Sequence, residues 1–178
     1  SIEALSKKLS QAESNGKLPK IVIPVHLAGQ PCDMISIKNL SKKYGFKIIE
    51  DASHAIGASY NDYKVGSCAH SDITVFSFHP VKIITTGEGG MALTNDPVIS
   101  ERLKRLRIHG ITNDKLIMID RPNNEIWNYQ QIELGFNYRM TDIQAAIGLS
   151  QIKRLDQYIK SRHKIAKIYN KKLSRLPL

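Results

Sequence analysis

Two short apolar runs joined by a helical segment constrain the fold of this chain more than any other feature. Residues 21–27 form the first run and predict a buried strand, and residues 46–51 predict a second strand. Between them, apolar side chains recur at helical spacing from Met34 to Tyr44, and Gly45 follows where a helix stop is expected. A strand, a helix and a strand in this order predict a βαβ unit, and hence parallel strands with a right-handed crossover.

The rest of the chain adds short elements in an order that suits one α/β domain of 178 residues. We expect a helix that ends near Gly16, a hairpin over 58–66, strands over 73–78 and 89–94, and a helix over 97–107. Residues 110–135 predict an irregular surface excursion. Thr141 is expected to cap a further helix that runs on into the stretch 151–178. The expected class is α/β, with a mostly parallel sheet flanked by helices.

The positive charge of the chain is concentrated near its end. The net charge is +10, yet residues 1–100 are almost neutral, whereas residues 151–178 hold nine Lys or Arg and one Asp. Apolar residues recur through that same stretch, so it predicts a long amphipathic helix with a solvated basic face. A nucleic-acid surface is the less favoured interpretation, because no aromatic stacking platform accompanies the charge.

Cysteine usage and hydropathy favour a cytoplasmic protein. Cys32 and Cys68 form no CxxC pair and have no metal-ligand cluster nearby, so two reduced thiols are expected rather than a disulfide or a metal site. No apolar run approaches the roughly 20 residues of a membrane span, and no secretory signal is present in this sequence. The chain begins with Ser1 rather than Met, and we expect it to be a fragment or a processed product.

Polar side chains that could take part in catalysis or ligand binding follow two of the expected strands. Asp51 ends the second strand, and Ser77, His79 and Lys82 follow the third. Ligands of open α/β sheets bind beyond the carboxyl ends of strands, so these residues are expected at one crevice. An acid and a lysine there suit pyridoxal phosphate, whose pyridinium pairs with a carboxylate and whose aldehyde forms a Schiff base with an amine. Taken singly, each residue has an ordinary explanation, as a turn former, a solvated lysine or a structural histidine.

Four ordered sequence blocks carry a resemblance to a known family. They are residues 50–58 (Glu-Asp-Ala-Ser-His-Ala-Ile-Gly-Ala), 65–67, 76–90 with Phe-Ser-Phe-His-Pro-Val-Lys, and 135–148 with Gly-Phe-Asn-Tyr-Arg-Met-Thr-Asp. Together they resemble the DegT/StrS sugar aminotransferases from about residue 20 to 173. The resemblance implies the central part of the large domain of a type I pyridoxal-phosphate-dependent transferase. Residues 1–150 would then be a cofactor-binding portion, and residues 151–178 a helix that leads towards a small C-terminal domain.

The resemblance also implies a role for each candidate residue around the cofactor. Lys82 would be the catalytic lysine that binds the cofactor covalently, and Asp51 would bind its pyridine nitrogen. His54 would lie near the ring hydroxyl, and Ser77 would hydrogen-bond the phosphate. Asn137 would reach the phosphate in the neighbouring subunit, so a homodimer with shared active sites is expected. His79 is a weaker candidate for substrate contact.

A branch of the family is indicated by three further segments. Lys82 stands where dehydratases of the family have a histidine. Residues 24–30, 79–86 and 130–135 are most similar to aminotransferases of pseudaminic-acid biosynthesis. The implied reaction moves an amino group, with glutamate as the expected donor, to the C4 ketone of a UDP-linked 4-keto-6-deoxy-hexosamine.

Two other functions are weighed against this one. A nicotinamide-dependent enzyme is disfavoured, because the G-x-G-x-x-A match at 87–92 precedes an expected strand rather than a helix, and Arg107 stands where an acid is required. A truncated, catalytically silent fragment or a non-enzymatic binding module is the stronger alternative. The resemblance implies a full enzyme about twice as long, so this sequence is expected to lack the family's N-terminal segment and small C-terminal domain.

Overall fold

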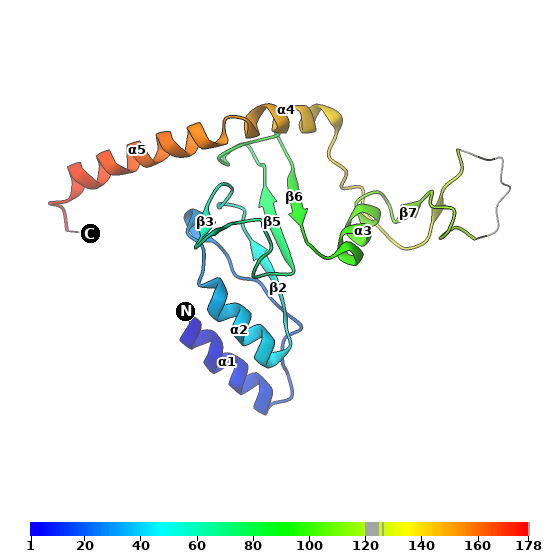
Figure 1. Cartoon of the computed structure of the whole chain (residues 1–178), viewed down its shortest axis with the longest axis horizontal. Helices are drawn as coiled ribbons and strands as arrows, with labels where there is room; N and C mark the ends of the chain where they lie inside the picture. Colours follow the sequence, from blue (N-terminus) through cyan, green and yellow to red (C-terminus); the bar gives the residue numbers. More distant parts are fainter. Residues whose placement is uncertain (120–124, 126, 178) are drawn as a thin grey trace.

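A four-stranded sheet forms the centre of the molecule in a computed structural model that describes residues 1–119, 125 and 127–177. The strand order is β1-β2-β5-β6. Strands β1 (Ile21–Val22), β2 (Lys47–Asp51) and β5 (Ile73–Ser77) run parallel, and β6 (Gly90–Leu93) pairs antiparallel with β5. Helices lie beside the sheet (Figure 1). The expectation of an α/β fold with a mostly parallel sheet is therefore confirmed.

Two N-terminal helices close one part of the core. Helix α1 (Ile2–Ser14) lies beside α2 (Met34–Tyr44), which connects β1 to β2 (Figure 1). Asp33 caps α2 by accepting a hydrogen bond from the Ser36 amide, and Gly45 ends it at φ 79°. The predicted βαβ unit is present, and its first core cluster consists of Leu9, Met34, Ile37, Tyr44, Phe46 and Ile48.

The segment 21–27 corrects one expectation, because it is not a buried strand. Only its first two residues pair as β1, and Ile23, Val25 and Leu27 are 58%, 48% and 69% exposed. Pro24 has no N–H to donate, which confines this segment to the edge of the sheet. The chain still follows β2 through single hydrogen bonds, since the Asp51 amide donates to the Pro24 carbonyl. A short 3₁₀ turn, η1 (Leu27–Gly29), then leads away from the sheet.

The middle of the chain mostly follows the sequence pattern. The hairpin is formed by β3 (Ser59–Tyr60) and β4 (Tyr63–Lys64), and α3 spans Pro97–Leu106. Within the predicted excursion, β7 (Ile111–Thr112) pairs with β8 (Gln130–Gln131), and residues 120–124 and 126 lie outside the described residues. A second core cluster lies under β5 and consists of Ala52, Ala55, Phe76, Phe78 and Ile84.

The C-terminal part forms two helices rather than the single continuous helix that was expected. Helix α4 (Asp142–Ile152) begins with the predicted cap, in which Thr141 and Gln144 form a capping box. The helical path is interrupted at residues 153–154, and α5 (Leu155–Leu173) continues in a changed direction (Figure 1). Leu155 and Tyr158 pack against the second core cluster, and this packing explains the break. Among the described residues, no helix is both long and apolar enough to cross a membrane.

A buried polar network lies beside β2 and β5. Glu50 accepts hydrogen bonds from His26 Nε2 at 2.7 Å, from Thr74 Oγ1 at 3.0 Å, and from the Ser71 hydroxyl. The Cys32 amide donates to His26 Nδ1, which leaves the ring proton on Nε2 to face Glu50. Burial raises the pKa of Glu50, but the three hydrogen bonds outweigh it and hold this pKa below its usual range.

Replacing Glu50 by alanine is therefore expected to lower the free energy of unfolding by about 3 kcal/mol, because three buried donors lose their acceptor. The folded-state pKa of Glu50 lies below its ordinary value of 4.5. Its stabilisation is therefore complete above that pH and is lost as the pH falls through the lowered pKa. Urea denaturation at several pH values measures the effect. Glu101→Ala, which removes an exposed pair with Lys104, is the control and should change little. Equal losses in both variants would contradict the assignment.

Candidate functional site

Asp51 lies at the end of β2 on the same face of the sheet as Ser77. Asp51 is in register with Val75, and side chains alternate along a strand, so Ser77 projects from the same face two residues later. The Asp51 carboxylate accepts a hydrogen bond from the Ser53 amide at 3.1 Å. Hydrogen bonding to Ser53, and then the nearby charges of His54 and Lys82, hold the pKa of Asp51 below its usual range. Asp51 is thus an anion at neutral pH, and it lies close enough to Lys82 to sense its charge.

Lys82 lies on a loop that is held by backbone hydrogen bonds to Phe78. The Phe78 amide donates to the Gly89 carbonyl at 2.8 Å, and the Phe78 carbonyl accepts from the Thr86 amide at 3.0 Å. Within the loop, the Lys82 amide donates to the His79 carbonyl at 3.0 Å, and Ile84 is buried in the second core cluster. These contacts place a half-buried amine just beyond the carboxyl end of β5.

A cleft of about 920 Å³ brings Lys82 together with His54. Its walls come from the turn after β1, the segment after β2, Lys64 of β4, the loop after β5 that carries Lys82, and α5. The Ala28 amide donates to His54 Nδ1 at 3.3 Å, which ties the first wall to the second. A cleft of this size suits a small organic ligand. His54 and Lys82 therefore line one cleft, while the predicted meeting of Asp51 and Lys82 around a cofactor stays a prediction.

The other four candidates, Asp51, Ser77, His79 and Asn137, are not among the described residues that line this cleft. Ser77 is half-buried, and its Oγ accepts a long hydrogen bond of 3.5 Å from the His79 amide. His79 is exposed, and its Nε2 lies 3.9 Å from the Glu88 carboxylate. Asn137 is exposed beside α3, where it forms an isolated β-bridge with Ile108. The roles predicted for these residues stay predictions.

The sequence interpretation missed the residues that α5 contributes to the cleft. Ile159, Arg162, His163 and Ala166 all line it, whereas the basic face of this helix, with Arg162, was expected to be solvated. These positions follow the i, i+3, i+4, i+7 spacing of one helical face. The spacing was visible in the sequence, but the surface that this face covers depends on how α5 packs.

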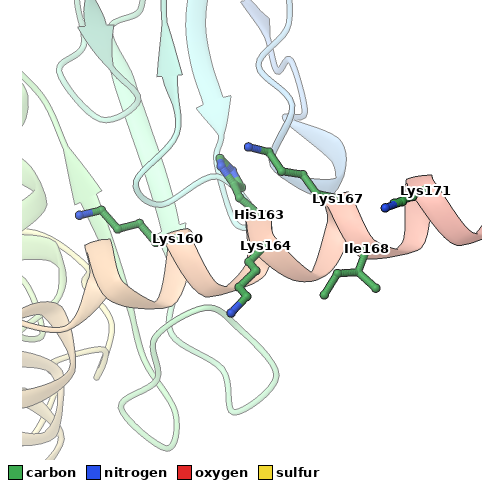
Figure 2. Close-up of a pocket in the computed structure, with 6 residues that line it drawn as sticks. All are labelled: Lys160, His163, Lys164, Lys167, Ile168 and Lys171. Carbon is green, nitrogen blue, oxygen red and sulfur yellow. The ribbon is translucent and has the colours of Figure 1, made fainter.

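A second hollow of about 550 Å³ runs along α5 alone and holds none of the candidate residues (Figure 2). It is lined by Lys160, His163, Lys164, Lys167, Ile168 and Lys171. Figure 2 shows that His163 and Lys164 leave opposite sides of the helix. Because a single helix lines it, this hollow is an open basic surface rather than an enclosed site.

The fold is that of aminotransferases of the pyridoxal-phosphate type, as solved structures show. Helicobacter pylori PseC, described as an aminotransferase involved in the biosynthesis of pseudaminic acid, superposes with a TM-score of 0.80 at 32% identity, over 90% of this chain and 40% of that chain. The chain belongs to the DegT/DnrJ/EryC1/StrS aminotransferase family, whose sequence profile matches residues 3–178. Aminotransferases of this family depend on pyridoxal phosphate. The resemblance seen in the sequence is thus confirmed.

Two curated relatives add substrate names. A UDP-4-amino-4,6-dideoxy-N-acetyl-β-L-altrosamine transaminase of Campylobacter jejuni is 42% identical over 153 residues, which cover 86% of this chain and 38% of that protein. A GDP-perosamine synthase of Caulobacter vibrioides is 43% identical over 157 residues, which cover 88% of this chain and 38% of that protein. The chain therefore spans well under half the length of these relatives.

Proposed function

We propose that this protein transfers an amino group from glutamate to the C4 ketone of a UDP-linked 4-keto-6-deoxy-hexosamine, with pyridoxal phosphate as cofactor. The observation that carries the proposal is that Lys82 shares a cleft with His54, just beyond the ends of the paired strands that carry Asp51 and Ser77. The likeness to the Campylobacter jejuni transaminase and to PseC supports the sugar substrate.

The donor set fits the cofactor. An anionic carboxylate at Asp51 suits a protonated pyridine nitrogen, and the amine of Lys82 suits an aldehyde. Ser77 offers a hydroxyl from the same sheet face as Asp51, which suits the phosphate. His54 lies in the cleft with Lys82, where it can hydrogen-bond a ring hydroxyl.

The residues of the chain have distinct tasks in the reaction. When bound, the cofactor supplies an aldehyde that carries the amino group and a ring that accepts electrons. Asp51 keeps the ring nitrogen protonated and so favours electron withdrawal. Lys82 would hold the cofactor through its amine and would move a proton between the cofactor and the substrate carbon. His79 would contact the substrate from the surface side.

We also infer an assembly around this site. Asn137 is exposed away from the cleft, which suits a contact with a cofactor in a second subunit of a homodimer. Residues 1–150 would form part of the cofactor-binding domain, and residues 151–178 would lead towards a small C-terminal domain. Cys32 and Cys68 are both free thiols, in keeping with a reducing, cytoplasmic setting.

Borohydride reduction followed by peptide mass spectrometry tests the proposal on the protein as its gene encodes it. The expected result is a phosphopyridoxyl adduct on the peptide that contains Lys82, since reduction makes the lysine–cofactor bond permanent. Glutamate added before reduction should prevent the adduct, because its amino group displaces the lysine.

The amino acceptor is then identified by product mass. A UDP-4-keto-6-deoxy-hexosamine should gain one amino group, with 2-oxoglutarate formed in equal amount, and the GDP-linked analogue should react more slowly. An adduct on another lysine would overturn the role of Lys82. No adduct at all would favour the alternative of a silent or non-enzymatic protein.

A further inference from the structure

The cleft around Lys82 is strongly cationic. Lys64 of β4 and Arg162 of α5 line it together with Lys82, and His54 and His163 add two imidazoles. No Asp or Glu is among the described residues that line it. Lys82 and His54 have tasks on the cofactor, whereas the proposed chemistry leaves Lys64, Arg162 and His163 without one.

These basic side chains are available for a ligand. In the described parts of the chain, neither Lys64 nor Arg162 forms an ion pair with an acidic side chain. Arg162 differs in this from Arg105, which pairs with Glu133. A cluster of like charges without counter-ions is unfavourable in the empty protein, so an anionic ligand gains binding energy by neutralising it.

The position of Arg162 is fixed by the packing of α5. Ile159, one turn earlier, contacts the backbone at Gly57, and a Cβ atom at Gly57 would collide with the Ile159 side chain. Leu155 and Tyr158 anchor the start of the helix on the second core cluster. Arg162 and His163 are thus held at the cleft by a packed helix rather than by a loose segment, which favours specific recognition.

We propose that Arg162, assisted by Lys64 and His163, binds the diphosphate group of the nucleotide-sugar substrate. This inference rests on the proposed function and adds the residues that hold its substrate. A guanidinium presents paired N–H donors that match phosphate oxygens, and Lys64 of β4 adds a point charge to the same cleft. The diphosphate is also the part that UDP- and GDP-linked sugars share, as in the names of the two curated relatives.

The test measures the binding of UDP by calorimetry to the protein as its gene encodes it, with and without pyridoxal phosphate. Arg162→Ala and Lys64→Ala should each raise the Kd for UDP about tenfold or more, because each removes a charge-assisted contact. Lys164→Ala is the matched control, since Lys164 leaves the other side of α5 and does not line the cleft (Figure 2). It should leave the Kd unchanged.

Steady-state kinetics separate the diphosphate from the carboxylates of the amino donor. Arg162→Ala should raise the KM for the nucleotide sugar and leave the KM for glutamate and the cofactor absorbance unchanged. An unchanged Kd for UDP, an equal loss in Lys164→Ala, or a rise confined to the KM for glutamate would each overturn the inference. Failure of the proposed function would instead appear as missing cofactor absorbance in the unmodified protein, and UDP binding without cofactor would still test the cleft.

Discussion

Replacement of Lys82 by alanine should abolish the absorbance of the lysine-bound cofactor and lower turnover by about 1,000-fold or more. Two functions are lost together, because the amine both binds the cofactor and moves the proton. The loop that carries Lys82 is fastened through the backbone of Phe78, so the fold should survive the change. Spectra of the purified variant and single-turnover kinetics with glutamate measure the two losses.

Lys17→Ala is the matched control, since Lys17 is exposed beyond the end of α1, away from the cleft. It should keep both the spectrum and the turnover. A small primary amine added to Lys82→Ala should restore part of the proton transfer, which a merely structural lysine would not allow. A normal spectrum in Lys82→Ala would end the assignment of this residue.

Replacement of Asp51 by asparagine should lower turnover by about 100- to 1,000-fold while the cofactor still binds. Asparagine has nearly the same shape but no charge, so it cannot hold the ring nitrogen protonated. Because the pKa of Asp51 is already lowered by Ser53, His54 and Lys82, the unmodified protein should keep its active anion into mildly acidic solution. Its activity should fall only as the pH drops through that lowered pKa.

The pH profile provides the discriminating measurement for Asp51. The asparagine variant should lack the acidic limb that belongs to this carboxylate. Asp62→Asn, an exposed change in the turn between β3 and β4, should leave both rate and profile as they were. Comparable losses in the two variants, or full turnover in Asp51→Asn, would remove Asp51 from the reaction.

The sequence was most informative where local pattern and tertiary context agree. The helix Met34–Tyr44 and the cap at Thr141 were predictable, because helical spacing and capping chemistry are local. The segment 21–27 was not, because its apolar composition suggested burial while Pro24 keeps it at the sheet edge. The break before Leu155 was missed because it follows from packing on a distant core cluster.

Some residues of the candidate site could be predicted from the sequence and others could not. Asp51 and Lys82 could be proposed from their places at strand ends, since neighbouring parallel strands bring such residues together. The contribution of Arg162 could not, because its helical face meets the cleft only after α5 has docked. Helical spacing identifies which residues share a face, but not which surface that face will cover.

The absence of a Cβ atom at Gly57 allows α5 to pack closely at the cleft. The Ile159 side chain of α5 lies against the main chain of Gly57, so a methyl group added at Gly57 would collide with it. This collision would push α5 away from the segment after β2 and widen the cleft. A single glycine in the lining of the cleft therefore sets how closely α5 approaches the segment after β2.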